Sequence, residues 1–227
     1  MHPCCIFGII ELDQQIYSFY TAICPRHSAW EALASSAIGM DKSQFTNMSP
    51  SDLSNLSHAF RATMRLFPAS VCVIATGESP QRCGLTATAV CSLSMDPPQI
   101  LICLNTSSGT WPSIESHGHF SVNVLSAEQV DMAQLFSGQS RTKFGDGRFD
   151  DSQWFKGPAG SPILRGAALA LDCSVVHHHI SGTHAIIIGS IEWLDLSWLD
   201  KSVRPAVLGY AEGNFGEWSR LPDEAPQ

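Results

Sequence analysis

Positive charge is scarce in this sequence, and charge of either sign is sparse. The 227 residues include 13 Lys and Arg against 21 Asp and Glu, and charged residues make up only 15% of the chain. Proteins that bind nucleic acid generally present a basic face, so we expect no nucleic-acid partner. An acidic chain with a net charge of −8 can still bind a phosphate group through backbone N–H groups, hydroxyls and one or two local bases.

Long hydrophobic runs and several common motifs are absent as well. No apolar stretch approaches the roughly 20 residues of a membrane-spanning helix, so we expect no membrane partner. The eight cysteines form no C-x-x-C pair, which argues against a thioredoxin-like site and a cysteine-rich zinc site. The sequence has no G-x-G-x-x-G after an expected strand, no Walker A loop and no G-x-S-x-G elbow. It therefore indicates no Rossmann dinucleotide site, no P-loop and no serine hydrolase.

The cysteines that are present indicate a cytoplasmic protein. Cys72, Cys91, Cys103 and Cys173 lie inside apolar runs. Small buried thiols in a reducing compartment explain this placement better than disulfides do.

Residues 1–48 differ from the rest of the chain. They are partly apolar but show no steady helical or strand period, and Glu11 and Asp13 interrupt the apolar run, so we expect no secretion signal. We predict a poorly ordered extension, or translated upstream sequence ahead of a start at Met40 or Met48. Residues 49–217 are expected to form the domain and residues 218–227 a tail.

Hydrophobic residues make up 44% of the chain, enough for a sizeable core in one large domain. Apolar residues recur at three- and four-residue steps over 49–67, which predicts an amphipathic helix. Two short helices are expected near 110–117 and from Ser126 to just before Gly138. The remaining apolar runs are short and mostly rich in β-branched residues, which predicts strands near 71–76, 84–93, 100–105, 119–125, 168–176, 184–194 and 206–210.

These elements predict a mainly β fold. The helices are too few to alternate with the strands, so a doubly wound parallel sheet does not fit. Six or seven mostly antiparallel strands indicate a barrel or a sandwich. Several strands are apolar at successive positions, which predicts that both of their faces are buried.

Three histidines in sequence raise the question of a metal site. On a strand, His177 and His179 share one face while His178 points away, and His184 could supply a third ligand across a hairpin. Histidines near turns are more often only solvated, so we predict no metal site.

Two polar segments are the strongest candidates for chemistry. "TATAVCSLS" (86–94) is expected to place Thr86 and Thr88 on one strand face and small alanines on the other, where a flat ring could approach the backbone. "NTSSGT" (105–110) offers an amide and four hydroxyls ahead of a helix, which suits a phosphate. From spacing alone, a Ser/Thr turn that merely caps the helix is the stronger interpretation.

The order of the motifs resembles a known family. The pieces are "FRATMRLFPASVCVIAT" (60–76), "GLTATAVCSLSMDPPQILICLN" (84–105), "SSGTWPSI" (107–114), "HFSVNVLSAEQVDMAQLFSG" (119–138), "GSPILRGAALALDCSVV" (160–176) and "SGTHAIIIGSIEWL" (181–194). Together they resemble the flavin reductase domain of two-component flavin-dependent monooxygenases, an FMN-binding split β-barrel. The resemblance covers roughly residues 55–215.

The resemblance implies a function that composition and period do not show. It implies a homodimer with flavin near the subunit interface, and an enzyme that uses NADH or NADPH to reduce FMN or FAD. The reduced flavin would pass to a separate flavin-dependent oxygenase. The rival hypotheses are a non-catalytic protein that senses or stores flavin, a pyridoxamine-phosphate-oxidase-like enzyme, and a structural dimer that has lost its site.

The same resemblance implies roles for individual residues. His184 would lie near the nicotinamide, although Thr183 stands where the family usually has an aspartate. Lys143 and Phe144 would lie near the phosphate and ring, with Arg141 as a substitute cation. The other expected flavin-binding residues are Thr86, Ala87, Thr88, Ala89, Asn105, Thr106, Ser107, Ser108, Thr110 and Asn123, for the last of which a strand hydrogen bond is an equal interpretation.

Overall fold

The computed structural model of the protein describes residues 53–138, 145–197, 200 and 205–218, with side chains from residue 56 onward. The chain divides into two compact units, residues 1–64 and 65–227. This division lies within the segment 49–67 that the sequence predicts as an amphipathic helix. No helix in the described part of the chain is long and apolar enough to cross a membrane.

The described part of the first unit is helix α4 (Leu53–Met64). Leu56, Phe60 and Met64 recur every four residues, as the sequence predicts, and all three are exposed. The first residues of the predicted helix, 49–52, lie outside the described residues.

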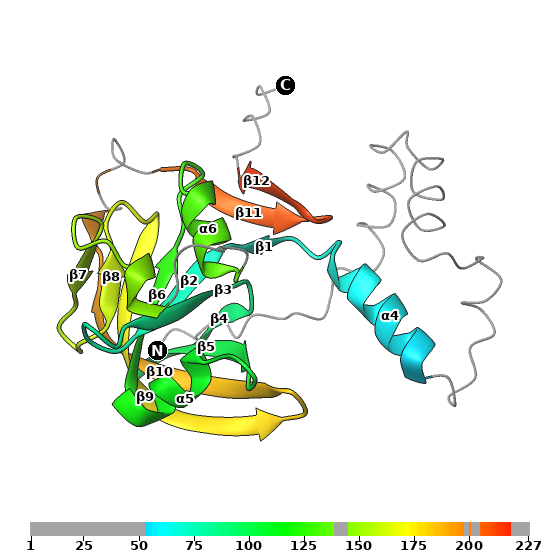
Figure 1. The fold of residues 1–227 in the computed structure, drawn as a ribbon, viewed down its shortest axis with the longest axis horizontal. Coiled ribbons are helices and arrows are strands. Elements are labelled where there is room, and N and C mark those ends of the chain that lie inside the picture. Colours follow the sequence, from blue (N-terminus) through cyan, green and yellow to red (C-terminus); the bar gives the residue numbers. More distant parts are fainter. Residues whose placement is uncertain (1–52, 139–144, 198–199, 201–204, 219–227) are drawn as a thin grey trace, which may run out of the picture. The chain divides into compact units, whose positions relative to one another are not determined.

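The second unit is built from antiparallel strands, which confirms the predicted fold class (Figure 1). Its main sheet has seven strands in the order β3-β2-β6-β9-β10-β5-β4. The bounds of these strands are β2 Cys72–Thr76, β3 Cys83–Ala87, β4 Val90–Met95, β5 Pro98–Asn105, β6 His119–Val124, β9 Leu169–Ser181 and β10 His184–Leu194. Two smaller sheets complete the unit: β1 (Ala69–Ser70), β11 (Val207–Ala211) and β12 (Asn214–Trp218) form one, and β7 (Trp154–Lys156) and β8 (Pro162–Leu164) form the other.

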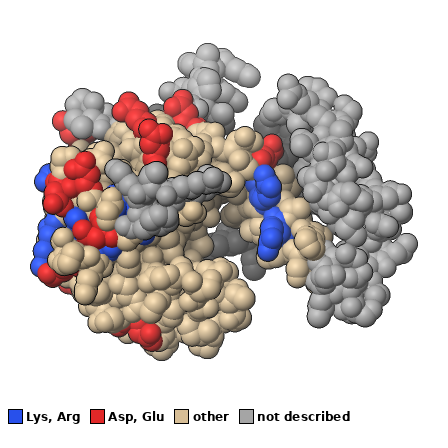
Figure 2. Space-filling view, in the orientation of Figure 1, with Lys and Arg blue, Asp and Glu red and all other residues tan. Residues whose placement is uncertain are grey.

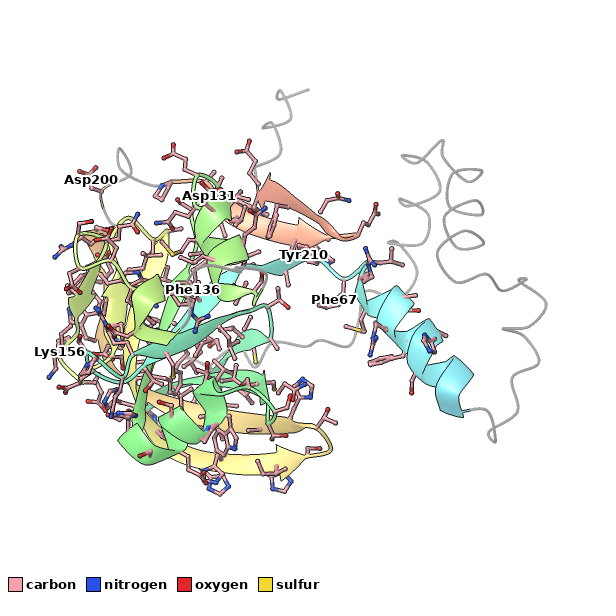
Figure 3. The ribbon with its side chains drawn as sticks, viewed as in Figure 1. Phe67, Asp131, Phe136, Lys156, Asp200 and Tyr210 are labelled. Atoms are coloured by element: carbon pink, nitrogen blue, oxygen red, sulfur yellow. The ribbon has the colours of Figure 1, made fainter. Side chains whose placement is uncertain are left out.

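The main sheet buries both of its faces at its centre. Strand β2 is fully buried, and its alternate residues enter two different hydrophobic clusters. Val73 packs with Phe136 of helix α6 (Val130–Phe136), whereas Ile74 packs with Ile114 of helix α5 (Thr110–His117). The side chains in Figure 3 fill the space between these helices and the sheet. Burial on both faces, as predicted for strands with successive apolar residues, holds for β2 and β6, whereas alternate residues of β5 and β10 are only partly buried.

The predicted "TATA" strand is shorter than the sequence suggests. Strand β3 ends at Ala87, and β4 begins at Val90, whose N–H bonds the carbonyl of Thr88 at 3.1 Å. Thr88 and Ala89 therefore connect the two edge strands of the main sheet, and the alternation of faces does not continue through them. The sheet is open between β3 and β4, and a cavity lies at this edge.

Candidate functional site

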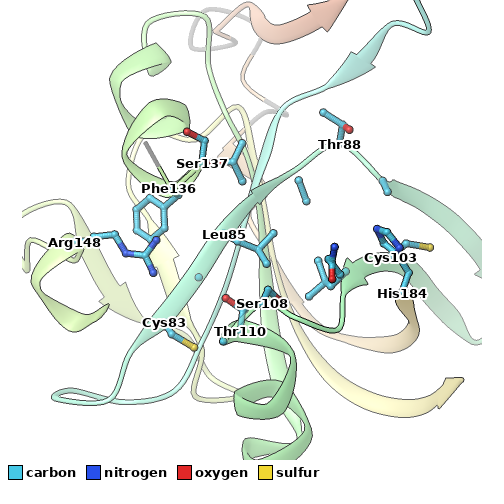
Figure 4. A pocket seen from close by; sticks show the side chains of 18 of the residues that line it. Cys83, Leu85, Thr88, Cys103, Ser108, Thr110, Phe136, Ser137, Arg148 and His184 are labelled. Atoms are coloured by element: carbon cyan, nitrogen blue, oxygen red, sulfur yellow. The ribbon is translucent and has the colours of Figure 1, made fainter. Parts of the chain in front are cut away.

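A cavity of about 700 Å³ lies beside β3 and the carboxyl end of β5 (Figure 4). The residues that line it come from β3 and its connection to β4, from the end of β5 and the segment between β5 and α5, from the end of α6, from residues 145–148 and from the hairpin of β9 and β10. They are Cys83, Gly84, Leu85, Thr86, Ala87, Thr88, Ala89, Cys103, Leu104, Asn105, Ser108, Gly109, Thr110, Phe136, Ser137, Gly138, Gly145, Arg148 and His184. Most of the predicted site residues are brought together here.

One end of the cavity is lined by small residues and by His184. Thr88, Ala89 and Cys103 lie there, and Figure 4 shows Cys103 beside His184. The strand register explains this meeting, because His184 of β10 pairs with Asn105 of β5. An edge of this kind leaves room for a flat ring to approach the backbone of the β3–β4 connection.

The middle of the cavity is polar and carries an unsatisfied donor. Ser108 and Thr110 line it just ahead of and at the start of α5, whose first residues have no side-chain cap. The hydroxyl of Ser108 is buried and has no hydrogen-bond partner within the described residues. Free N–H groups at a helix start and a buried unpaired hydroxyl together suit the phosphate of a ligand.

Arg148 supplies a cation at the other end of the cavity. Its guanidinium lies 4.7 Å from the centre of the Phe136 ring, and no carboxylate in the described residues forms an ion pair with it. Partial burial lowers the pKa of Arg148 because desolvation disfavours the charged form. An anionic ligand in the cavity would compensate this unpaired charge.

The position of Arg148 depends on a second arginine. Arg82 precedes β3 and reaches the short 3₁₀ helix η1 (Gly145–Arg148), where its Nε lies 2.6 Å from Asp146 Oδ1. Its Nη1 lies 2.6 Å from Asp151 Oδ1. The Arg82 guanidinium holds the pKa of Asp146 below its usual range through a charged hydrogen bond. This clamp attaches η1 to the sheet and so presents Arg148 to the cavity.

Three predicted flavin-binding residues lie outside the cavity lining. Thr106 bonds the carbonyl of Thr183, and Ser107 bonds Asn105 Oδ1 at 2.8 Å. Asn123 is fully buried, where its Nδ2 donates to the carbonyl of Val73 at 3.1 Å. Its Oδ1 accepts the N–H of Leu164 at 2.8 Å. Asn123 therefore has the structural role that the sequence left open, since its amide joins β8 to the main sheet.

The predicted basic–aromatic pair and the histidines of β9 are the remaining candidates from the sequence. Lys143 and Phe144 lie outside the described residues, as does Arg141. His177 and His179 pair with Ile188 and Ile186 on β10, but no group of three metal-ligating side chains within the described ranges could hold an ion.

Comparison with known proteins identifies the family. The flavin reductase like domain family matches residues 64–219, which is most of the chain.

The chain belongs to the flavin reductase like domain family.

Individual relatives agree with this membership. The chain is 40% identical over 128 residues to the FMN reductase (NADH) RutF of Stutzerimonas stutzeri, covering 56% of this chain and 72% of the relative. It is 36% identical over 138 residues to the 4-hydroxyphenylacetate 3-monooxygenase reductase component of Salmonella typhimurium, which covers 61% of this chain and 81% of the relative. Among solved structures, the chain resembles BorF, the flavin reductase component of a bacterial two-component tryptophan halogenase. The two superpose with a TM-score of 0.64 at 30% identity, over 74% of this chain and 99% of BorF.

Among the lining residues that were not predicted as site residues, three carry a thiol or a charge: Cys83, Cys103 and Arg148. Arg148 had a local signal, because it follows the glycine pair of "FGDGRF" (144–149) in an otherwise acidic segment. Cys83 had only a weak signal, a position beside the basic residue Arg82, and Cys103 had none, because it lies inside an apolar run. Burial raises the pKa of Cys103, which argues against a reactive thiolate there.

Proposed function

We propose that this protein is an NAD(P)H-dependent flavin reductase that supplies reduced FMN or FAD to a separate flavin-dependent monooxygenase. The observation that carries the proposal is the cavity, in which a small-residue edge, the unpaired Ser108 hydroxyl and the Arg148 cation follow one another. In this order the small-residue edge suits the flavin ring, and the Ser108 hydroxyl and Arg148 suit the phosphate at the end of the ribityl chain. The relatives named above are reductases or reductase components, which supports the same reaction.

The residues present fit a flavin without a further catalytic group. When bound, a flavin would supply a ring that can take up a hydride from a nicotinamide, chemistry that needs ring stacking more than acid–base help. Thr88 and Ala89 would contact the ring, and Ser108 and Thr110 would bind the phosphate together with the first N–H groups of α5. Arg148 would neutralise the phosphate charge. His184 lies at the ring end, where it would contact a nicotinamide.

We extend the proposal to a homodimer formed over the outer face of β5, β9 and β10. On this face Leu101, Cys103, Ile186 and Ile188 are only partly buried. The region around the β9–β10 hairpin, at the bottom of Figure 2, shows few charged side chains. Because His184 lies on the same face, a second copy there would also cover the ring end of the cavity. Sedimentation velocity of the wild type and of Ile186→Lys tests this, and an unchanged dimer in the variant would refute it.

The free thiols support a cytoplasmic location. Within the described residues, Cys72, Cys83, Cys91, Cys103 and Cys173 are all unpaired. Burial raises the pKa of both Cys72 and Cys173 to about 12. Unpaired cysteines of this kind are typical of a reducing compartment.

The decisive experiment is oxidation of NADH and NADPH by the purified protein in air, with FMN, FAD, riboflavin or no flavin. We expect oxidation that depends on added flavin, and the relative rates rank the flavins and the nicotinamides. Tight flavin binding without oxidation of either nicotinamide would refute the reductase and favour a protein that senses or stores flavin. The partner is tested next, by adding a flavin-dependent monooxygenase and following its product.

A further inference from the structure

The tip of the β9–β10 hairpin is attached to the segment that follows β5. The carbonyl of Thr183 accepts two hydrogen bonds from Thr106, one from its N–H at 2.9 Å and one from its Oγ1 at 3.1 Å. Strand pairing places His184 directly opposite Asn105. The turn that carries His184 is therefore held against the segment that leads to Ser108 and α5.

The same turn also holds the His184 ring. The Oγ1 of Thr183 lies 2.9 Å from Nδ1 of His184, and neither group has another side-chain partner within the described residues. His184 lines the ring end of the cavity, beside Cys103 (Figure 4). Because Thr183 occupies Nδ1, the other ring nitrogen, Nε2, is the one left to bind a ligand.

The identity of residue 183 decides which nitrogen carries the proton. A neutral imidazole has one N–H, and a hydroxyl can either donate to Nδ1 or accept from it. A carboxylate at this position can only accept, which places the proton on Nδ1 and leaves Nε2 an acceptor unless the ring is charged. Both residues are exposed, and within the described residues Nδ1 is the acceptor that lies within hydrogen-bond distance of the Thr183 hydroxyl.

We propose that Thr183 is a positioning residue that donates to Nδ1 of His184 and keeps the proton on Nε2. His184 then acts as a neutral hydrogen-bond donor toward the carboxamide oxygen of a nicotinamide. This inference rests on the proposed function, because the nicotinamide is the ligand that the reductase reaction supplies. An aspartate at position 183 could not donate to Nδ1, so Nε2 would then carry a proton only if the His184 ring were charged.

The tautomer can be measured without turnover. Long-range ¹H–¹⁵N spectra of histidine-labelled protein at about pH 8, where a histidine is ordinarily neutral, distinguish a protonated from an unprotonated ring nitrogen. His184→Gln assigns the signals. We expect Nε2–H in the wild type and in Thr183→Ser, and a proton on Nδ1 in Thr183→Asp. Thr106→Val is the matched control, because it removes a bond to the same turn without touching the ring and should leave the tautomer unchanged. A proton on Nδ1 in the wild type would overturn the proposal.

Kinetics then separate positioning from general loosening of the turn. Thr183→Val should raise the KM for NADH by about 2- to 10-fold, the effect of one lost hydrogen bond, while kcat and the KM for flavin change less. Thr183→Ser should restore the wild-type KM. Equal increases for NADH and flavin, or no increase at all, would contradict a role through His184. If the wild type oxidises no nicotinamide, the proposed function fails, but the spectra still decide the tautomer.

Discussion

Replacement of Arg148 by methionine tests the phosphate end of the cavity. The guanidinium lies 4.7 Å from the Phe136 ring centre and lines the cavity, and no ion-pair partner for it lies within the described residues. A hydrogen bond to a charged group contributes about 1.5–3 kcal/mol, so Arg148→Met should weaken FMN binding by about 10- to 150-fold. Methionine retains an apolar side chain over Phe136.

Riboflavin makes the test specific, because it has the ring and ribityl chain of FMN but no phosphate. Fluorescence titration should show that Arg148→Met weakens FMN binding strongly and riboflavin binding little. The expected change in the free energy of unfolding is within about 1 kcal/mol, since relief of desolvation offsets the lost cation–π contact.

Arg165→Met is the matched control for this experiment. The Arg165 guanidinium lies 4.8 Å from the centre of the Phe155 ring, so it makes the same kind of contact, but it does not line the cavity. FMN affinity should be unchanged in this variant. Equal losses of FMN and riboflavin binding in Arg148→Met would show that Arg148 acts by packing, and unchanged FMN binding would refute a phosphate contact.

Three further predictions follow from burial and close contacts. Ser108→Ala should weaken FMN binding by about 2- to 10-fold in titrations. The loss of stability should be small, because the Ser108 hydroxyl has no hydrogen-bond partner within the described residues. Ser107→Ala, which removes a hydroxyl bonded to Asn105, should weaken FMN binding less. Gly84→Ala should lower the free energy of unfolding, measured in urea, by about 1–3 kcal/mol, since the added Cβ would lie 2.6 Å from a carbonyl oxygen of β2. Gly109→Ala should leave the free energy of unfolding unchanged, because a Cβ there meets nothing within 4 Å. Burial lowers the pKa of His119 from 6.5, so the unfolded chain binds a proton first as the pH falls below about 6.5. Urea titrations should therefore show the free energy of unfolding falling as the pH drops below about 6.5, until the folded-state pKa of His119 is passed. His119→Asn should make this fall with pH smaller. The same dependence on pH in the variant would show that His119 is not its cause.

The sequence alone determined the family and much of the local structure. The runs near 110–117 and 184–194 became α5 and β10 with the predicted bounds. These elements carry a strong local signal, because β-branched residues favour strands and a glycine ends the helix with positive φ at Gly118. Strands β1, β7, β8 and β12 were missed, since each is short and depends on a partner strand.

Only the tertiary structure decided which polar residues reach the cavity. Thr106, Ser107 and Ser108 are neighbours in sequence, yet only Ser108 lines it, because the first two bond the hairpin tip and Asn105. Arg148 reaches it through the clamp of Arg82 on Asp146, which are 64 residues apart. A local pattern records the preference of a segment for helix or strand. The direction of each polar side chain is instead set by contacts between distant segments, which local patterns do not encode.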